Sequence, residues 1–213
     1  MSVEAKFDAT MTVHAIVLAA GAGTRFGADP PKLLASWRGR PLIEPVLATL
    51  ASAQAEGLVS EVFVVYPPEH PAIGKLAHET GFDAVLVTRS RPAISETIKA
   101  GMVTMTAMHD LRGVSGVLLV LGDQPKISVD AIRAVIARAA GSPAALVRPR
   151  YAGAPEEPGH PVFVGRVHFG LLEATEGDQG LDAVVKQQGR EWRYVELPGT
   201  NPDVDTPEDL KTL

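Results

Sequence analysis

"HAIVLAAGAGTRFGADPPKLL", residues 14–34, joins an apolar, strand-like run to a loop with three glycines, one arginine and one lysine. A glycine-rich turn after the first strand of an open parallel sheet commonly binds phosphate, through exposed backbone N–H groups and a helix start. The stretch therefore predicts an α/β fold with an anion site close to residue 20.

Two well-known phosphate loops do not fit this stretch. A P-loop needs Gly-Lys-Ser/Thr after four spacer residues, whereas Gly27 is followed by Ala28 and Asp29. A dinucleotide fingerprint needs G-x-G-x-x-G, and the spacing from Gly21 and Gly23 to Gly27 is one residue too long. What remains is the pattern G-x-G-x-R-x-G followed by Pro-Lys.

Short apolar runs recur along the chain, nearly continuous in apolar residues as in strands buried on both faces of a parallel sheet. Between them, apolar residues at three-and-four spacing predict helices. The expected strands are 14–20, 61–67, 83–88, 116–123 and 144–149, and the expected helices are 42–56, 72–80, 95–109 and 128–140. We therefore predict a Rossmann-like three-layer α/β sandwich with a mostly parallel sheet, in which Ser95 and Ser128 cap their helices.

The pattern changes beyond Tyr151, where a Pro/Gly/Glu loop precedes a strand-like run, an amphipathic helix and a further strand-like run. We interpret this part as a small C-terminal substrate lobe set on the sheet. Residues 1–12 are expected to be flexible, and residues 13–213 to form a single domain.

Composition narrows the class of protein. The chain has 213 residues, 46% of them hydrophobic, with a net charge of −5 and both signs of charge spread along the sequence. The absence of cysteine excludes disulfides, thiolate metal sites and cysteine nucleophiles. No run approaches the roughly 20 apolar residues of a membrane span. We expect a cytoplasmic enzyme without nucleic-acid or membrane partners.

The stretch "LAAGAGTRFG…PK" resembles the nucleotidyltransferase signature L-A-A-G-x-G-x-R-x-G…P-K, and the chain resembles the molybdenum-cofactor nucleotidyltransferases, especially the cytidylyltransferases. Further segments follow in the family's order: "KLLASWRGRPLIEPVL" (32–47), "LGDQP" (121–125), "GHPVFV" (159–164), "GDQG" (177–180) and "DVDTPEDL" (203–210). "LAAG", in place of the L-A-G-G of the guanylyltransferases, favours cytidine. The resemblance implies a nucleotide-diphospho-sugar transferase-like fold.

The same resemblance implies the reaction and its partners. A nucleoside monophosphate would pass from CTP to a phosphorylated acceptor, such as molybdopterin or the molybdenum cofactor, with release of pyrophosphate, and a molybdoenzyme would be a partner protein. The implied catalytic residues are Arg25, Lys32 and Asp123. The implied nucleotide-binding residues are Leu18, Ala19, Ala20, Gly21, Gly23, Arg25, Lys32, Ser95, Thr97 and Asp123.

The residue types suit this chemistry. Attack on an α-phosphate requires phosphates held in line with the nucleophile and neutralised. Arg25 and Lys32 supply positive charge, and Asp123 follows an apolar strand where a carboxylate can hold Mg²⁺ that bridges phosphate oxygens. The family's nucleophile is itself an ionised phosphate, so no general base is needed.

A second metal ligand is expected in "DVDTPEDL". Magnesium on a triphosphate usually takes one or two protein carboxylates, so Asp123 leaves room for a partner. Asp203 and Asp205 would face opposite ways in an extended stretch. We choose Asp205, because Thr206 and Pro207 fix its position at a helix start. The alternative is that Asp205 only caps that helix.

Other predictions concern the acceptor and the alternatives. The resemblance assigns acceptor binding to His160 and Asp178. Segment 91–101, "RPAISETIKAG", departs from the family by carrying Arg91 for a small residue and Glu96 for a serine. We expect the carboxylate of Glu96 to affect base choice or repel phosphate. Two other hypotheses are an NAD(P)H-dependent oxidoreductase of the nicotine-blue reductase type and a non-catalytic nucleotide-binding accessory protein.

Overall fold

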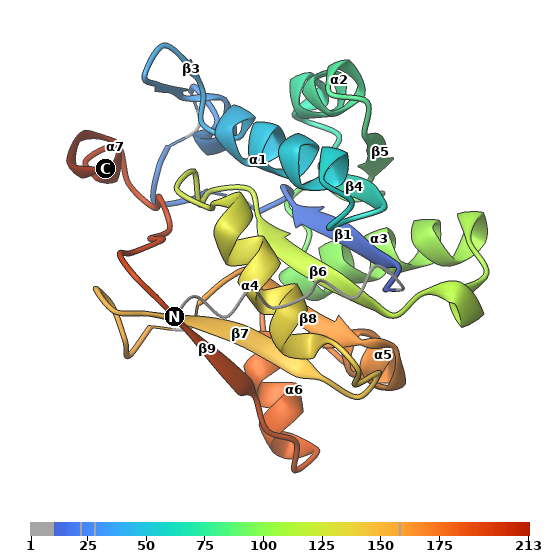
Figure 1. The fold of residues 1–213 in the computed structure, drawn as a ribbon. Helices are drawn as coiled ribbons and strands as arrows, with labels where there is room; N and C mark the ends of the chain where they lie inside the picture. The colour runs from blue at the N-terminus through green and yellow to red at the C-terminus, as the bar shows by residue number, and fades with distance from the viewer. Residues whose placement is uncertain (1–10, 22, 28, 158) are drawn as a thin grey trace.

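The computed structural model describes residues 11–21, 23–27, 29–157 and 159–213. Most of the segment expected to be flexible, residues 1–12, therefore lies outside the described residues. A seven-stranded sheet in the order β5-β4-β1-β6-β8-β7-β9 forms the centre of the molecule (Figure 1). Its strands are β1 (Val13–Leu18), β4 (Glu61–Tyr66), β5 (Asp83–Leu86), β6 (Gly116–Leu121), β7 (Leu146–Tyr151), β8 (Val162–Gly165) and β9 (Arg193–Leu197).

The sheet is mostly parallel, as predicted. β1 pairs in parallel with both β4 and β6, and β4 pairs in parallel with β5. β8 runs antiparallel to both β6 and β7, and β9 is parallel to β7. The carboxyl ends of β1, β4, β5 and β6 therefore lie at one edge of the sheet, where open α/β sheets bind ligands.

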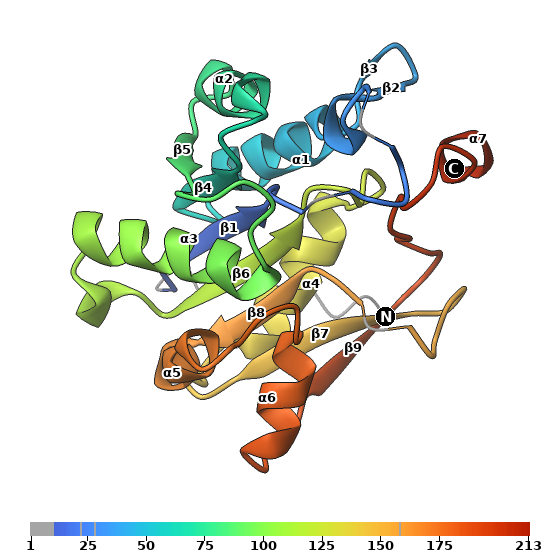
Figure 2. The same cartoon turned by 180° about the vertical axis from the view of Figure 1, so that it is seen from behind.

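Helices cover both faces of the sheet, which confirms the three-layer sandwich (Figures 1 and 2). One face carries α1 (Glu44–Ala55), α2 (Pro71–Glu79) and α4 (Val129–Ala139), and the other carries α3 (Ile94–Met108), α5 (Phe169–Glu173) and α6 (Leu181–Gln187). Successive residues of β1 enter opposite cores: Ala15 and Val17 belong to the first face and Ile16 to the second. This alternation explains why the strands are apolar throughout.

The segment beyond Tyr151, predicted as a lobe set on the sheet, contributes β8 and β9 to the sheet itself. Its helices α5 and α6 pack on the same face as α3. The smaller elements are a two-stranded hairpin, β2 (Ser36–Trp37) with β3 (Arg40–Pro41), and a last helix, α7 (Asp209–Thr212). No helix among the described residues combines the length and apolar character needed to cross a membrane.

The two predicted helix caps have different outcomes. Ser128 caps α4, because its hydroxyl accepts a hydrogen bond from the backbone N–H of Ala131 (3.2 Å). The cap predicted at Ser95 is wrong: α3 begins at Ile94, and the side chain of Glu96 reaches back to accept from the N–H of Ala93 (2.8 Å). Glu96, the third residue of the helix, thus satisfies the backbone N–H of the N-cap residue Ala93.

Candidate functional site

The candidate site is built where β1 and β6 end side by side. The backbone N–H of Gly122 donates to the carbonyl of Leu18 (3.2 Å), which joins the two strand ends. Asp123 follows directly, and the glycine-rich loop leaves β1 at the same place. Within that loop Gly23 has a φ of +54°, and a Cβ there would lie 3.2 Å from the Cβ of Lys32. A glycine is therefore needed where the loop passes the lysine.

Three ion pairs join the loop to the carboxylates. The Nζ of Lys32 lies 2.5 Å from Oδ2 of Asp123 and 3.6 Å from Oδ1 of Asp205. The guanidinium of Arg25 lies 2.9 Å from Oδ2 of Asp205. The Lys32 side chain is only 11% exposed and that of Asp123 20%, so their mutual attraction is screened less than at the surface. The structure thus brings together the four residues predicted to act on phosphate and metal.

The C-terminal segment of residues 203–205 contacts Asp123 by a backbone hydrogen bond. The N–H of Val204 donates to the carbonyl of Asp123 (3.1 Å), which places Asp203 and Asp205 on either side of this contact. Asp205 turns to Lys32 and Arg25, whereas the carboxylate of Asp203 accepts from Nε2 of Gln124 (2.6 Å). Burial, followed by the negative charge of Asp123, raises the pKa of Asp203 above its ordinary value.

The side chain of Asp205 does not cap α7. Helix α7 begins at Asp209 without a side-chain cap among the described residues, and Oδ2 of Asp209 accepts from the backbone N–H groups of Asp205 (2.8 Å) and Thr206 (2.7 Å) ahead of the helix. The hydroxyl of Thr206 in turn accepts from the N–H of Asp209 (3.4 Å). These reciprocal bonds hold the turn before α7, and the Asp205 carboxylate contacts Arg25 and Lys32 instead.

The carboxylates are chemically suited to a divalent metal. Oδ1 of Asp123 is buried and has no hydrogen-bond partner among the described residues, while its Oδ2 faces Lys32. Burying a carboxylate oxygen without a hydrogen-bond donor costs free energy, unless a bound cation or another ligand contacts that oxygen. Within the described parts of the chain, no three His, Asp or Glu side chains are grouped to hold a metal by themselves.

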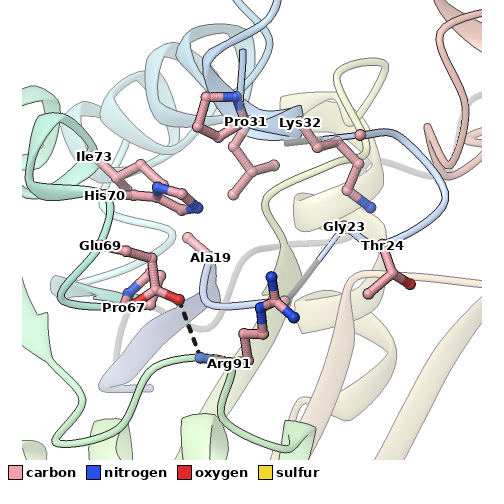
Figure 3. A pocket seen from close by; sticks show the side chains of 13 residues that line it. Ala19, Gly23, Thr24, Pro31, Lys32, Pro67, Glu69, His70, Ile73 and Arg91 are labelled. Atoms are coloured by element: carbon pink, nitrogen blue, oxygen red, sulfur yellow. Dashed lines mark hydrogen bonds between the residues drawn. The ribbon is translucent and has the colours of Figure 1, made fainter. Parts of the chain in front are cut away.

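Two adjoining cavities open at this edge of the sheet, with volumes of about 470 and 580 Å³. We call them the histidine cavity, which His70, Pro67 and Ile73 line, and the carboxylate cavity, which Asp123 and Asp205 line. Figure 3 shows the histidine cavity, with the imidazole of His70 on one side and the ammonium of Lys32 on the other. The residues that line both cavities are Gly21, Gly23, Thr24, Lys32 and Arg91.

The predicted nucleotide-binding residues lie mostly along this cleft. Leu18 and Thr97 line the carboxylate cavity, and Ala19 lines the histidine cavity. Ala20 and Ser95 are buried and line neither. The Ser95 backbone N–H donates to the carbonyl of Gly177 (3.1 Å), so this serine connects α3 to the 177–180 turn instead of facing the cleft.

The two predicted acceptor residues are separated. Asp178 lines the carboxylate cavity, and its carboxylate accepts from the N–H of Ile94 at the start of α3 (3.2 Å). His160 lines neither cavity, and its Nδ1 is buried without a partner among the described residues. Burial and the positive charge of Arg148 lower the pKa of His160 to about 4. The ring is therefore neutral at pH 7, beside a cation.

Several lining residues were not foreseen as part of a site. Glu69 and His70 line the histidine cavity and Arg89 the carboxylate cavity, all from loops after β4 and β5. The position after a parallel strand was the available signal, because such loops meet at one edge of the sheet. Glu96, expected to act on the nucleotide, lines the carboxylate cavity but already bonds Arg89 (3.0 Å) and the N–H of Ala93.

Known proteins resemble this chain over most of its length. The model of the MobA-like NTP transferase domain matches residues 15–192. The bifunctional protein GlmU of Neisseria gonorrhoeae is 26% identical over 181 residues, which are 83% of this chain and 33% of GlmU. The chain thus spans about a third of the length of that curated relative.

Two solved structures are similar in fold and sequence. A homolog of Rv0371c from Mycobacterium sp. strain JC1 superposes with a TM-score of 0.74 and 28% identity, covering 94% of this chain and 93% of that one. Rv0371c of Mycobacterium tuberculosis H37Rv, in complex with manganese, has a TM-score of 0.74 and 26% identity, covering 95% and 97%. Both structures match nearly the full length of this chain, and both confirm its α/β architecture.

Proposed function

The chain belongs to the MobA-like NTP transferase domain family, and from this premise we propose that it transfers a nucleoside monophosphate from an NTP to a phosphorylated small molecule. An acceptor phosphate oxygen attacks the α-phosphorus, the bond from the α-phosphorus to the bridging oxygen breaks, and pyrophosphate leaves with the bonding electrons. CTP is the proposed donor, because "LAAG" at residues 18–21 resembles the cytidine branch. The proposed acceptor is molybdopterin or another phosphorylated compound.

The observation that carries this proposal is the pairing of two loop cations with two carboxylates at the ends of β1 and β6. Lys32 and Arg25 contact Asp123 and Asp205, all four beside the carboxylate cavity. A triphosphate needs cations at its oxygens, and its metal needs carboxylates, at one place. Gly21 and Gly23, which carry no side chain, line the same cavity.

A divalent metal fits these residues. Asp123 and Asp205 would hold Mg²⁺, whose role when bound is to neutralise charge on the phosphate oxygens. The unpartnered Oδ1 of Asp123 supports this assignment. The similar Rv0371c forms a complex with manganese, which supports a divalent ion of this class.

The chain's own residues would orient and neutralise the reactants. Lys32, largely buried, would stabilise negative charge that grows on the leaving pyrophosphate. Arg25, 74% exposed, would close on the triphosphate from the solvent side. Asp178, which also lines the carboxylate cavity, is the remaining acceptor candidate. The nucleophile is already ionised, so no side chain has to remove a proton.

The experiment that tests the proposal is a melting-temperature screen with each of the four NTPs and Mg²⁺, followed by pyrophosphate detection with phosphorylated acceptors. We expect CTP to stabilise the protein most and to release pyrophosphate only when an acceptor is present. A larger shift with GTP would favour the guanylyl branch. Nucleotide binding without pyrophosphate release at any acceptor would support the accessory hypothesis, and NAD(P)H oxidation without nucleotide turnover would support the reductase hypothesis.

A further inference from the structure

Four cationic side chains, of lysine or arginine, line the two cavities. Three of them face carboxylates: the pairs are Lys32–Asp123, Arg25–Asp205 and Arg89–Glu96. The fourth, Arg91, lines both cavities and forms no ion pair within the described residues. In Figure 3 its guanidinium points into the histidine cavity, toward the glycine-rich loop. An unpaired guanidinium in a cavity favours an anionic ligand.

The backbone of Arg91 is held in an unusual conformation. Its φ is +52°, in the left-handed region that residues with a long side chain rarely adopt. Such conformations persist where the surroundings fix them, and they are frequent at ligand sites. Here the backbone directs the side chain of Arg91 inward.

Glu69 fixes this turn from the neighbouring loop. Its Oε1 accepts from the backbone N–H of Arg91 (3.1 Å), the bond that is drawn in Figure 3. Desolvation alone would raise the pKa of Glu69, but hydrogen bonds from its own N–H and that of Arg91 outweigh this effect and lower the pKa. The carboxylate therefore stays ionised and accepts from the Arg91 backbone at neutral pH.

We propose that Arg91 is a phosphate-binding residue at the junction of the histidine and carboxylate cavities, and that Glu69 is its positioning residue. The inference deepens the proposed function on which it rests, because the phosphate belongs either to the nucleotide or to the phosphorylated acceptor. The planar guanidinium can donate two parallel hydrogen bonds to phosphate oxygens. Lys32 lines the same junction, so a phosphate there would meet two cations.

The test uses Arg91→Gly, because glycine adopts a positive φ without strain and the fold should be retained. By calorimetric titration, the dissociation constant of the ligand whose phosphate Arg91 contacts, CTP or the acceptor phosphate, should rise about tenfold or more, as expected for loss of a charge-assisted hydrogen bond. The dissociation constant of cytidine, which has no phosphate, should not change. Melting temperature should stay the same or rise.

Arg38→Gly is the matched control. Arg38 also has a positive φ, of 50°, but it lies in the β2–β3 turn, stacks on Trp37 (4.4 Å) and lines neither cavity. Its replacement makes the same change of residue type in a similar backbone conformation. Nucleotide affinity should stay at the wild-type value, so a loss seen only in Arg91→Gly belongs to the guanidinium.

The two phosphate sources are separated by a second titration, of inorganic phosphate into protein saturated with CMP. If Arg91→Gly binds CTP more weakly than the wild-type protein does, Arg91 contacts a phosphate of the nucleotide. If Arg91→Gly binds CTP as the wild-type protein does but its CMP complex binds inorganic phosphate more weakly, Arg91 contacts the phosphate of the acceptor. No loss in either titration, or an equal loss for cytidine, overturns the proposal.

Glu69→Ala tests the positioning role. It should weaken CTP or phosphate binding when Arg91 is present and have no further effect in the Arg91→Gly background. An equal effect in both backgrounds would contradict positioning through Arg91.

Failure of this inference can be told from failure of the proposed function. If the wild-type protein binds no nucleotide but binds inorganic tripolyphosphate more tightly than Arg91→Gly does, the nucleotidyl-transfer proposal fails and the anion site stands. If the wild-type protein binds none of these phosphate compounds, both proposals are overturned.

Discussion

Lys32 lies between two carboxylates, and the effect of its removal is the most direct test at the scale of single residues. Lys32→Ala should lower turnover on the order of a hundredfold or more, because it removes the proposed electrostatic contact to the leaving pyrophosphate. The far-ultraviolet circular dichroism spectrum should be unchanged. Pyrophosphate release under saturating CTP is the measurement.

Lys75→Ala is the control for this substitution. Lys75 is 76% exposed on α2, and among the described residues it pairs only with Glu79 in the next turn. A pair of this kind contributes little, so activity and stability should both be preserved. Unchanged turnover in Lys32→Ala would mean that Lys32 has no part in the reaction.

The metal assignment predicts different behaviour for three aspartates. Asp123→Asn and Asp205→Asn should raise the Mg²⁺ concentration needed for half-maximal activity, because each removes a charged ligand. Asp203→Asn should not, since that carboxylate accepts from Gln124. Activity against Mg²⁺ concentration and melting temperature are measured for each variant. If Asp205→Asn lowers melting but leaves the Mg²⁺ dependence unchanged, the second ligand is another residue.

Sequence motifs could indicate Arg25, Lys32, Asp123 and Asp205 because each carries a charge at a defined place in a linear signature. A linear signature does not predict which side chains are buried. His160 looked like a polar loop residue, yet its ring is buried beside Arg148 and outside both cavities. The Glu69 contact to Arg91 joins two loops, and no spacing along the chain predicts it.

Among the elements, α3 makes an especially close contact with the sheet. A Cβ on Gly101 would lie 2.6 Å from Cγ2 of Ile16 in β1 and 3.2 Å from Cγ2 of Val65 in β4. Gly101→Ala should therefore lower the free energy of unfolding by about 1–2 kcal/mol, because overpacking outweighs the gain in helix propensity. Urea denaturation measures the change.

Gly170→Ala provides the opposite case in another helix. A Cβ at Gly170, in α5, would have no neighbouring atom within 4 Å. With no overpacking to oppose it, the alanine should raise stability by up to about 1 kcal/mol. If both variants changed stability in the same direction, close packing at Gly101 would not be the cause.

Element type and order could be predicted because continuous apolar runs and three-and-four spacing report burial directly. Strand direction could not, since the apolar run of β8 has the same composition whether it lies parallel or antiparallel. The start of α3 was misplaced for a related reason. The cap there comes from Glu96 reaching back to Ala93, and the polar Ser95 nearby drew the prediction.

At the scale of the whole molecule, two histidines should set the response to moderate acid. Burial, and then the charge of His109, lowers the pKa of His14, although Glu61 opposes this. Burial, and then Arg148, lowers the pKa of His160 to about 4. In the unfolded chain both rings become protonated near pH 6.5, which is above their pKa in the folded protein. The unfolded state therefore binds more protons between these values, so stability is lost as pH falls from about 6.5 toward 4.

Denaturation at pH 7, 6 and 5 at constant ionic strength tests this expectation. His160 alone accounts for up to about 2 kcal/mol between pH 7 and pH 5. His160→Gln should flatten the pH dependence, and His78→Gln, at an exposed position on α2, should leave it unchanged. Stability that stays constant over this range would show that the two rings are accessible to protons in the folded protein.

The contacts of Lys32 with Asp123 and of Arg25 with Asp205 have a consequence for how ligands enter. The cations contact both oxygens of Asp205 and Oδ2 of Asp123, and thereby compete with a metal for these carboxylates. The carboxylates in turn hold cations that a triphosphate would use. Each ligand therefore releases the binding groups of the other, which is positive heterotropic linkage. By reciprocity, CTP should increase the affinity for Mn²⁺ by the same factor as Mn²⁺ increases the affinity for CTP, and titrations in both orders measure it. The metal and the nucleotide would then load as one cooperative unit, and neither would accumulate on the protein without the other.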